Sequence, residues 1–279
     1  MTLLYIIAAA LAGGIISVTL AALVAWRVQP RLIPLFVSYA VGALLAVVFL
    51  DLLPHIFETT TEYHKVAAWI LAGILGFFVL EKMVLWRHSH DHGAQFASLT
   101  EPGSLIAKHT DHEHHHHGAP GGSNHGAHGN ESSAWMIIIG DGFHNFTDGL
   151  VIAAAFVADI RLGILTSVAI IAHELPQELG DFLVLIHSGM SKRRALFWNM
   201  VSSLATLVGA VLAYFLLQEL EAYSYIFLCL AAASMMYVAI ADLIPGLHRR
   251  TSLRDSLAQF ALIGLGIGSI LLVHFVIGH

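Results

Sequence analysis

Residues 32–56 read LIPLFVSYAVGALLAVVFLDLLPHI, a continuous apolar run that contains one charged side chain, Asp51. A helix needs about 20 mostly apolar residues to cross roughly 30 Å of hydrocarbon, so this run predicts a membrane-spanning helix. Seven other segments have the same character: residues 3–26, 66–86, 134–157, 162–187, 195–217, 223–246 and 257–277. The sequence therefore predicts an all-α integral membrane protein with eight transmembrane helices.

The composition excludes an ordinary soluble domain. Of the 279 residues, 57% are hydrophobic and 11% are charged, and the mean hydropathy is +0.75, whereas soluble domains carry about a quarter charged residues. The net charge of -6 argues against a nucleic-acid partner. Because Cys229 is the only cysteine, disulfides and thiolate clusters are excluded, and the 19 histidines point to metal binding through nitrogen and oxygen ligands.

Positive residues lie mostly on one side of the predicted membrane. Eleven of the thirteen lysines and arginines fall in the odd-numbered connections, and the even-numbered connections hold only Lys65 and Arg161. Because cytoplasmic connections carry an excess of Lys and Arg, both termini are expected outside and the third connection in the cytosol. A bacterial inner membrane fits the compact chain best, with a eukaryotic surface or organelle membrane as the alternative.

The third connection, residues 87–133, is rich in Gly and Ser and holds eleven histidines between His88 and His128. Such a segment cannot bury a core, so we expect a disordered loop between helices 1–3 (residues 1–86) and helices 4–8 (residues 134–279). It is either a solvated linker or a metal buffer or sensor. Imidazole is the commonest nitrogen ligand for zinc-like ions, which favours metal binding by His112, His114, His115, His116 and His117.

Two segments repeat a pattern at their ends. Residues 49–54 read FLDLLP and residues 240–245 read IADLIP, each with an Asp three residues before a Pro. Since even- and odd-numbered helices run in opposite directions, the match suggests an inverted repeat of helices 1–3 and 6–8 around a central pair, helices 4 and 5. The alternative is an ordinary helix-ending pattern. Asp51, His55 and Asp242 are accordingly either ligands along a transport pathway or capping and interfacial residues.

Helices 4 and 5 carry polar residues that a bilayer disfavours. On insertion scales each ionised carboxylate near the bilayer centre costs at least about 2.5–3.5 kcal/mol, and neither motif contains a Lys or Arg to compensate. His144 and Asp148, His173 and Gln177, and Glu174 and Glu178 are each four residues apart and share a helix face. Interhelical hydrogen bonds alone offset too little, so a divalent cation is the favoured interpretation.

The expected metal ligands lie on helices 4 and 5, where the two helices face each other: His144, Asn145, Asp148, His173, Glu174, Gln177 and Glu178. The pathway residues expected in the same helices are Asp141 and Asp181. Nitrogen and oxygen ligands suit Zn²⁺, Fe²⁺ or Mn²⁺ and do not suit Cu⁺.

Residues 144–149, HNFTDG, and residues 173–181, HELPQELGD, resemble the paired HNxxDG and HExPHExGD motifs of the ZIP (Zrt-, Irt-like protein) metal transporters. The resemblance covers the whole chain, including the eight helices, the outside termini and the histidine-rich loop. It implies a transporter, not an enzyme, that moves a divalent metal into the cytosol by alternating access, commonly as a homodimer. It implies no cofactor besides the transported metal, with Zn²⁺ expected and Fe²⁺, Mn²⁺ or Cd²⁺ as alternatives.

The chain departs from the family pattern at two positions. Gln177 replaces the second His of the fifth-helix motif, and Thr206 stands where some members have a glutamate that completes a second metal site. A single dominant site is therefore expected. The alternative function is an intramembrane zinc metallohydrolase that uses His173 and Glu174, because HELPQ is one residue short of H-E-x-x-H; Gln177 and Pro176 argue against it.

Overall fold

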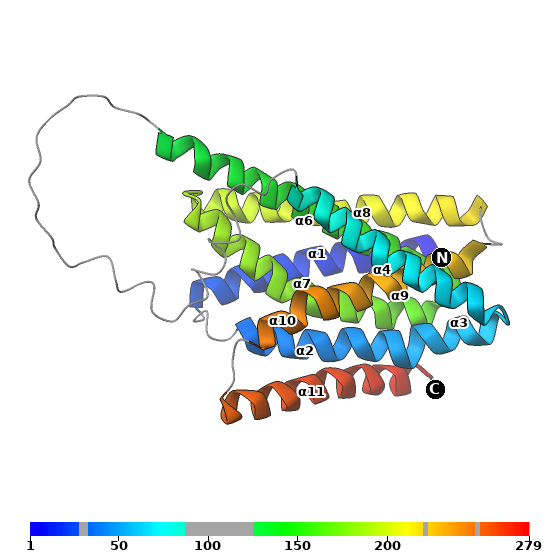
Figure 1. The fold of residues 1–279 in the computed structure, drawn as a ribbon. Helices are drawn as coiled ribbons and strands as arrows, with labels where there is room; N and C mark the ends of the chain where they lie inside the picture. The colour runs from blue at the N-terminus through cyan, green and yellow to red at the C-terminus, as the bar shows by residue number, and fades with distance from the viewer. Residues whose placement is uncertain (28–32, 87–124, 220–222, 249–251, 279) are drawn as a thin grey trace, which may run out of the picture.

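The computed structural model describes residues 1–27, 33–86, 125–219, 223–248 and 252–278, and every regular element within them is a helix (Figure 1). The elements are α1 (Thr2–Arg27), α2 (Ile33–Ala46), the π-helix η2 (Val47–Leu52), α3 (Leu53–Thr59), α4 (Tyr63–Trp86), α6 (His125–Ala158), α7 (Ile160–His187), α8 (Lys192–Glu219), α9 (Ser224–Tyr237), the π-helix η4 (Val238–Leu243), α10 (Ile244–Leu247) and α11 (Leu253–Gly278).

Within the described ranges, six helical segments are long and apolar enough to cross a membrane: Thr2–Val24, Ile33–Thr59, Tyr63–Met83, Lys192–Glu219, Ser224–Leu247 and Leu253–Ile277. The prediction of an all-α membrane protein is confirmed. Helices α6 and α7 are as long as these segments but carry the ionisable side chains, and their crossing of the membrane stays a prediction. The start of α1 and the end of α11 lie at the same end of the bundle (Figure 1), as an even number of crossings requires.

The two segments with the repeated pattern have the same local structure. Helices α2 and α9 each have 14 residues, and each is followed by a π-helix of 6 residues. Pro54 and Pro245 follow these π-helices at the same spacing. A proline has no N–H for the carbonyl four residues earlier, which favours a wider turn at this point. Helices α2 and α9 run in opposite directions (Figure 1), so the structure supports an inverted repeat.

Helices α6 and α8 meet through glycine. A Cβ atom on Gly149 would lie 2.0 Å from the carbonyl oxygen of Thr206, and one on Gly209 would lie 2.1 Å from that of Phe146. No larger residue fits these two positions without moving a backbone. The contact fixes α6 closely against α8, and α6 carries half of the site described below.

Helix α6 begins at His125, inside the range where the sequence predicts the disordered loop. Residues 87–124, with the predicted loop ligands His112 and His114 to His117, lie outside the described residues. The predicted domain boundaries at residues 86/87 and 133/134 stay predictions.

Candidate metal centre

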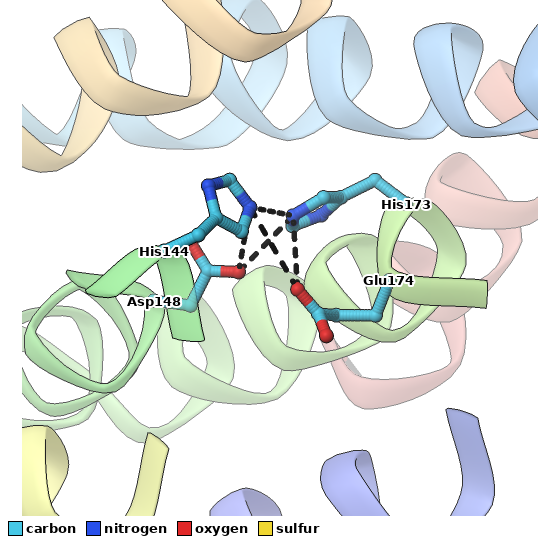
Figure 2. A group of neighbouring side chains, drawn as sticks. All are labelled: His144, Asp148, His173 and Glu174. Carbon is cyan, nitrogen blue, oxygen red and sulfur yellow. Dashed lines mark hydrogen bonds and ion pairs between the residues drawn. The ribbon is translucent and has the colours of Figure 1, made fainter. Parts of the chain in front are cut away.

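Helices α6 and α7 bring four side chains together, and Figure 2 shows them pointing toward one another. His144 and Asp148 lie one helical turn apart on α6, and His173 and Glu174 are adjacent on α7. Helix α7 begins at a defined point, because the side chain of Asp159 accepts hydrogen bonds from the backbone N–H groups of its first turn. It then continues through Pro176 to His187.

The distances in this cluster are those of a ligand set. His173 Nε2 lies 3.0 Å from Asp148 Oδ2, 3.6 Å from Glu174 Oε1 and 3.3 Å from His144 Nε2. His144 Nε2 lies 3.6 Å from Asp148 Oδ2 and 3.7 Å from Glu174 Oε1. One ligand atom from each residue falls within 4.8 Å of all the others. Tetrahedral ligands about 2.0–2.1 Å from a zinc ion are roughly 3.3 Å apart, so small shifts would close this cluster around a cation.

Burial makes the cluster costly without a cation. Asp148, His173 and Glu174 are 3%, 2% and 4% exposed. Within the described part of the chain, neither carboxylate oxygen of Glu174 has a hydrogen-bond partner. The imidazole nitrogens 3.6 and 3.7 Å from Glu174 Oε1 replace its lost hydration only in part, and a bound divalent cation supplies a stronger interaction. His173 Nδ1 lies 3.4 Å from the carbonyl oxygen of Ala169, and donation there leaves Nε2 free to coordinate.

Asn145, a predicted ligand, is held by other partners. Its Nδ2 donates to Asp141 Oδ1 at 2.9 Å, and its Oδ1 accepts from Thr206 Oγ1 at 2.9 Å. The second carboxylate oxygen of Asp141 accepts a hydrogen bond from Ser202 on α8. These bonds join α6 to α8, and ligation by Asn145 stays a prediction.

The other two predicted ligands on α7 differ from each other. Gln177 is half-buried, and its side chain makes no hydrogen bond to a residue that the structure describes. Glu178 is fully buried, and neither of its carboxylate oxygens has a hydrogen-bond partner among the described residues. Its electrostatic neighbours include Asp141 and Asp181, the two predicted pathway residues of helices 4 and 5. Glu178 therefore belongs to an acidic group beside the four-residue cluster.

Of the two aspartates in the repeated motifs, Asp242 has His173 of the central cluster among its electrostatic neighbours, whereas Asp51 pairs elsewhere. Asp51 on η2 is buried and pairs with His274 on α11, while Asp242 on η4 is exposed. His274 is a functional candidate that the sequence pattern did not indicate. The available signal was that an ionisable side chain within an apolar span needs a partner, but the partner lies 223 residues away in the sequence.

Several known proteins are similar in sequence to this chain. A family model described as "ZIP Zinc transporter" matches residues 1–274. The chain is 40% identical over 144 residues to the fruit-fly (Drosophila melanogaster) zinc transporter foi, which covers 50% of this chain and 20% of that protein. It is 38% identical over 165 residues to human zinc transporter ZIP10, covering 57% of this chain and 20% of that protein.

A third relative is the mouse metal cation symporter ZIP14, which is 40% identical over 138 residues, or 48% of this chain and 28% of that protein. This chain thus spans less than a third of the length of each of these three relatives. The stretches compared are therefore shared regions and not whole proteins.

Proposed function

Because this chain belongs to the ZIP zinc transporter family, whose members are transporters and not enzymes, we propose that it moves divalent metal ions, principally zinc, into the cytosol. The ion passes through a site made by His144, Asp148, His173 and Glu174, between α6 and α7, which are the predicted fourth and fifth transmembrane helices. The observation that carries the proposal is the convergence of these four groups, three of them buried, with no hydrogen-bond partner for either carboxylate oxygen of Glu174 among the described residues.

The chemistry of the four ligands suits this cargo. Two neutral imidazoles and two carboxylates form a nitrogen and oxygen set with a charge of about −2, which a divalent cation neutralises. Transport also requires release, so the site has to bind the ion with intermediate affinity. Gln177 offers a neutral amide where the family motif has an imidazole, which weakens coordination and favours release. Fe²⁺, Mn²⁺ and Cd²⁺ accept the same ligands and are the competing substrates.

The proposed arrangement in the membrane has both termini outside and the histidine-rich connection in the cytosol. The excess of Lys and Arg in the odd-numbered connections supports this orientation. A bacterial inner membrane and a homodimeric assembly complete the proposal. Alternating access would carry α6 and α7 past the other helices, and the glycine contact between α6 and α8 favours joint movement of α8 with them.

The metallohydrolase alternative has less support. That mechanism needs a second histidine on the face of α7 that carries His173, and Gln177 occupies the position. Family membership also favours transport over hydrolysis.

The proposal is tested by metal uptake into proteoliposomes, with Zn²⁺, Fe²⁺, Mn²⁺ and Cd²⁺ in turn. We expect the wild type to transport zinc and His173→Ala to reduce the uptake rate by at least about 100-fold. Loss of even an outer-shell partner reduces metal affinity or activity by about 10- to 100-fold. His187→Ala is the matched control, because His187 lies on the same helix, is exposed, and faces the carbonyl of Leu183. Uptake of no metal by the folded wild type, or equal loss in both variants, contradicts the proposal.

A further inference from the structure

A second group of titratable side chains lines a cavity of about 310 Å³. The residues around it come from η2, α3, α11 and the start of α7, and they include Asp51, His55, Glu58 and His274. The cavity lies at the end of the bundle where α3 and α11 finish, which is the end that holds both termini (Figure 1). The four residues of the central cluster are not among its lining residues.

Asp51 and His274 form the inner part of this group. Asp51 is 8% exposed and its Oδ1 lies 2.5 Å from His274 Nδ1. Its Oδ2 has no hydrogen-bond partner within the described ranges. An ionised carboxylate only accepts hydrogen bonds, so Nδ1 of His274 is the donor, and in the neutral imidazole Nε2 keeps its lone pair. A carboxylate that fixes one nitrogen of an imidazole in this way is the usual outer-shell support of a metal-ligating histidine.

His55 and Glu58 add ligands at the rim. His55 follows Asp51 by four residues, lines the same cavity, and also lines an adjoining cavity of about 630 Å³. Among the described residues, the charged side chains that line the smaller cavity are the acids Asp51, Glu58 and Asp159 and the cation Arg161. Three carboxylates facing one guanidinium give the cavity a net negative field that attracts cations.

We propose that this cavity is a binding site for a divalent transition-metal cation, separate from the central cluster. His274 and His55 supply imidazole nitrogens, Glu58 supplies a carboxylate, and Asp51 is the positioning residue that orients His274. These residue types are those of a zinc site with an open side. Their ligand atoms are farther apart than the 4.8 Å of the central cluster, so a cation would draw the side chains together across the cavity. That the cation held here is the transported one rests on the proposed function, but binding at this site does not.

The competing explanation is a purely structural pair that joins η2 to α11. It predicts that metal has no effect on His274 and that removing the Asp51 charge matters only for helix packing. Ser269 on α11 provides a matched comparison, because its hydroxyl lies 2.9 Å from the hydroxyl of Tyr39 on α2. Ser269→Ala therefore removes a polar contact between α11 and α2 and leaves every residue around the cavity in place.

The test is acylation of histidines by diethyl pyrocarbonate in the purified full chain, quantified residue by residue by mass spectrometry across a Zn²⁺ titration. His274 is suitable because its side chain is 58% exposed. We expect Zn²⁺ to protect His274 and His55 but not His187. In Asp51→Asn the zinc concentration for half-protection of His274 should rise by about 10- to 100-fold, whereas Ser269→Ala should leave it unchanged.

Two further variants keep the result interpretable. Glu58→Gln alters an exposed side chain, so it should fold normally and still raise the half-protection concentration several-fold. His173→Ala should leave protection of His274 intact, which separates this site from the central one. The proposal is overturned if zinc does not protect His274 in wild type, if Asp51→Asn and Glu58→Gln both match wild type, or if protection disappears in His173→Ala. If the wild type takes up no metal but zinc still protects His274, the proposed function is overturned and the proposal of this binding site is not.

Discussion

The central cluster and the outer cavity use the same kinds of side chain in opposite surroundings. Glu174 in the centre is 4% exposed, and neither of its carboxylate oxygens has a hydrogen-bond partner among the described residues. Glu58 in the outer cavity is exposed, and the outer imidazole of His274 is already paired with Asp51. In the centre, desolvation leaves the ligands in need of a cation, whereas the outer ligands stay hydrated without one. The same ligand types should therefore bind more selectively in the centre and exchange faster outside.

The largest expected effect comes from replacing a glutamate with glutamine in the central cluster, compared with the same replacement in the outer cavity. Glu174→Gln keeps the shape and removes a buried negative charge, so zinc uptake should fall by at least about 100-fold, more than the loss of an outer-shell partner causes. In metal-free protein the same change should raise the thermal midpoint, because it removes a buried carboxylate without a hydrogen-bond partner. Glu58→Gln should change neither property strongly, because its side chain is hydrated. Thermal unfolding in chelator, together with uptake, measures both.

A lower thermal midpoint for metal-free Glu174→Gln would mean that Glu174 stabilises the empty site. That result would contradict the claim that the central ligands need a cation. Equal loss of uptake in the two variants would mean that the outer carboxylate is as essential as the central one.

A smaller effect is expected from Gln177→His, which places a third imidazole on the face of α7 that carries His173. Zinc should bind about 10-fold more tightly, which corresponds to about 1.4 kcal/mol of binding free energy. Maximal uptake should not rise, because tighter binding also slows release. Zinc titration and uptake kinetics of the full chain check this, with protection of the outer His274 as the internal control. Unchanged affinity would place Gln177 outside the coordination sphere.

Much of the centre could be predicted from the sequence because its information is local. His144 and Asp148 are one helical turn apart, and His173 and Glu174 are adjacent, so helical periodicity alone places each pair on a face. The absence of Lys and Arg from both motifs then indicates a cation. The repeated Asp and Pro pattern was local too, and the structure adds the π-helices that the prolines favour.

The remainder depended on contacts between distant segments. His274 pairs with Asp51 across 223 residues, and no periodicity relates the two positions. Asn145 could not be separated from the ligands by spacing, because its partner Thr206 lies 61 residues away on another helix. Glu178 shares a face with Glu174, but its neighbours Asp141 and Asp181 become evident only when α6 and α7 are packed together.

The smallest expected effect tests whether Asn145 is a metal ligand or an amide that only joins two helices. Thr206→Val removes the hydroxyl that donates to Asn145 Oδ1 at 2.9 Å and keeps the side-chain volume. Interhelical hydrogen bonds in membranes average about 0.6 kcal/mol and reach about 1.7 kcal/mol, so the free energy of unfolding should fall by that amount. Zinc affinity should stay within about twofold, because Asn145 keeps its bond to Asp141 and α6 keeps its glycine contact with α8. Denaturant unfolding and zinc titration of the same preparation give both values. An affinity change of tenfold or more would instead assign Asn145 to the coordination sphere, since only a ligand whose amide oxygen had been released by the substitution would respond so strongly.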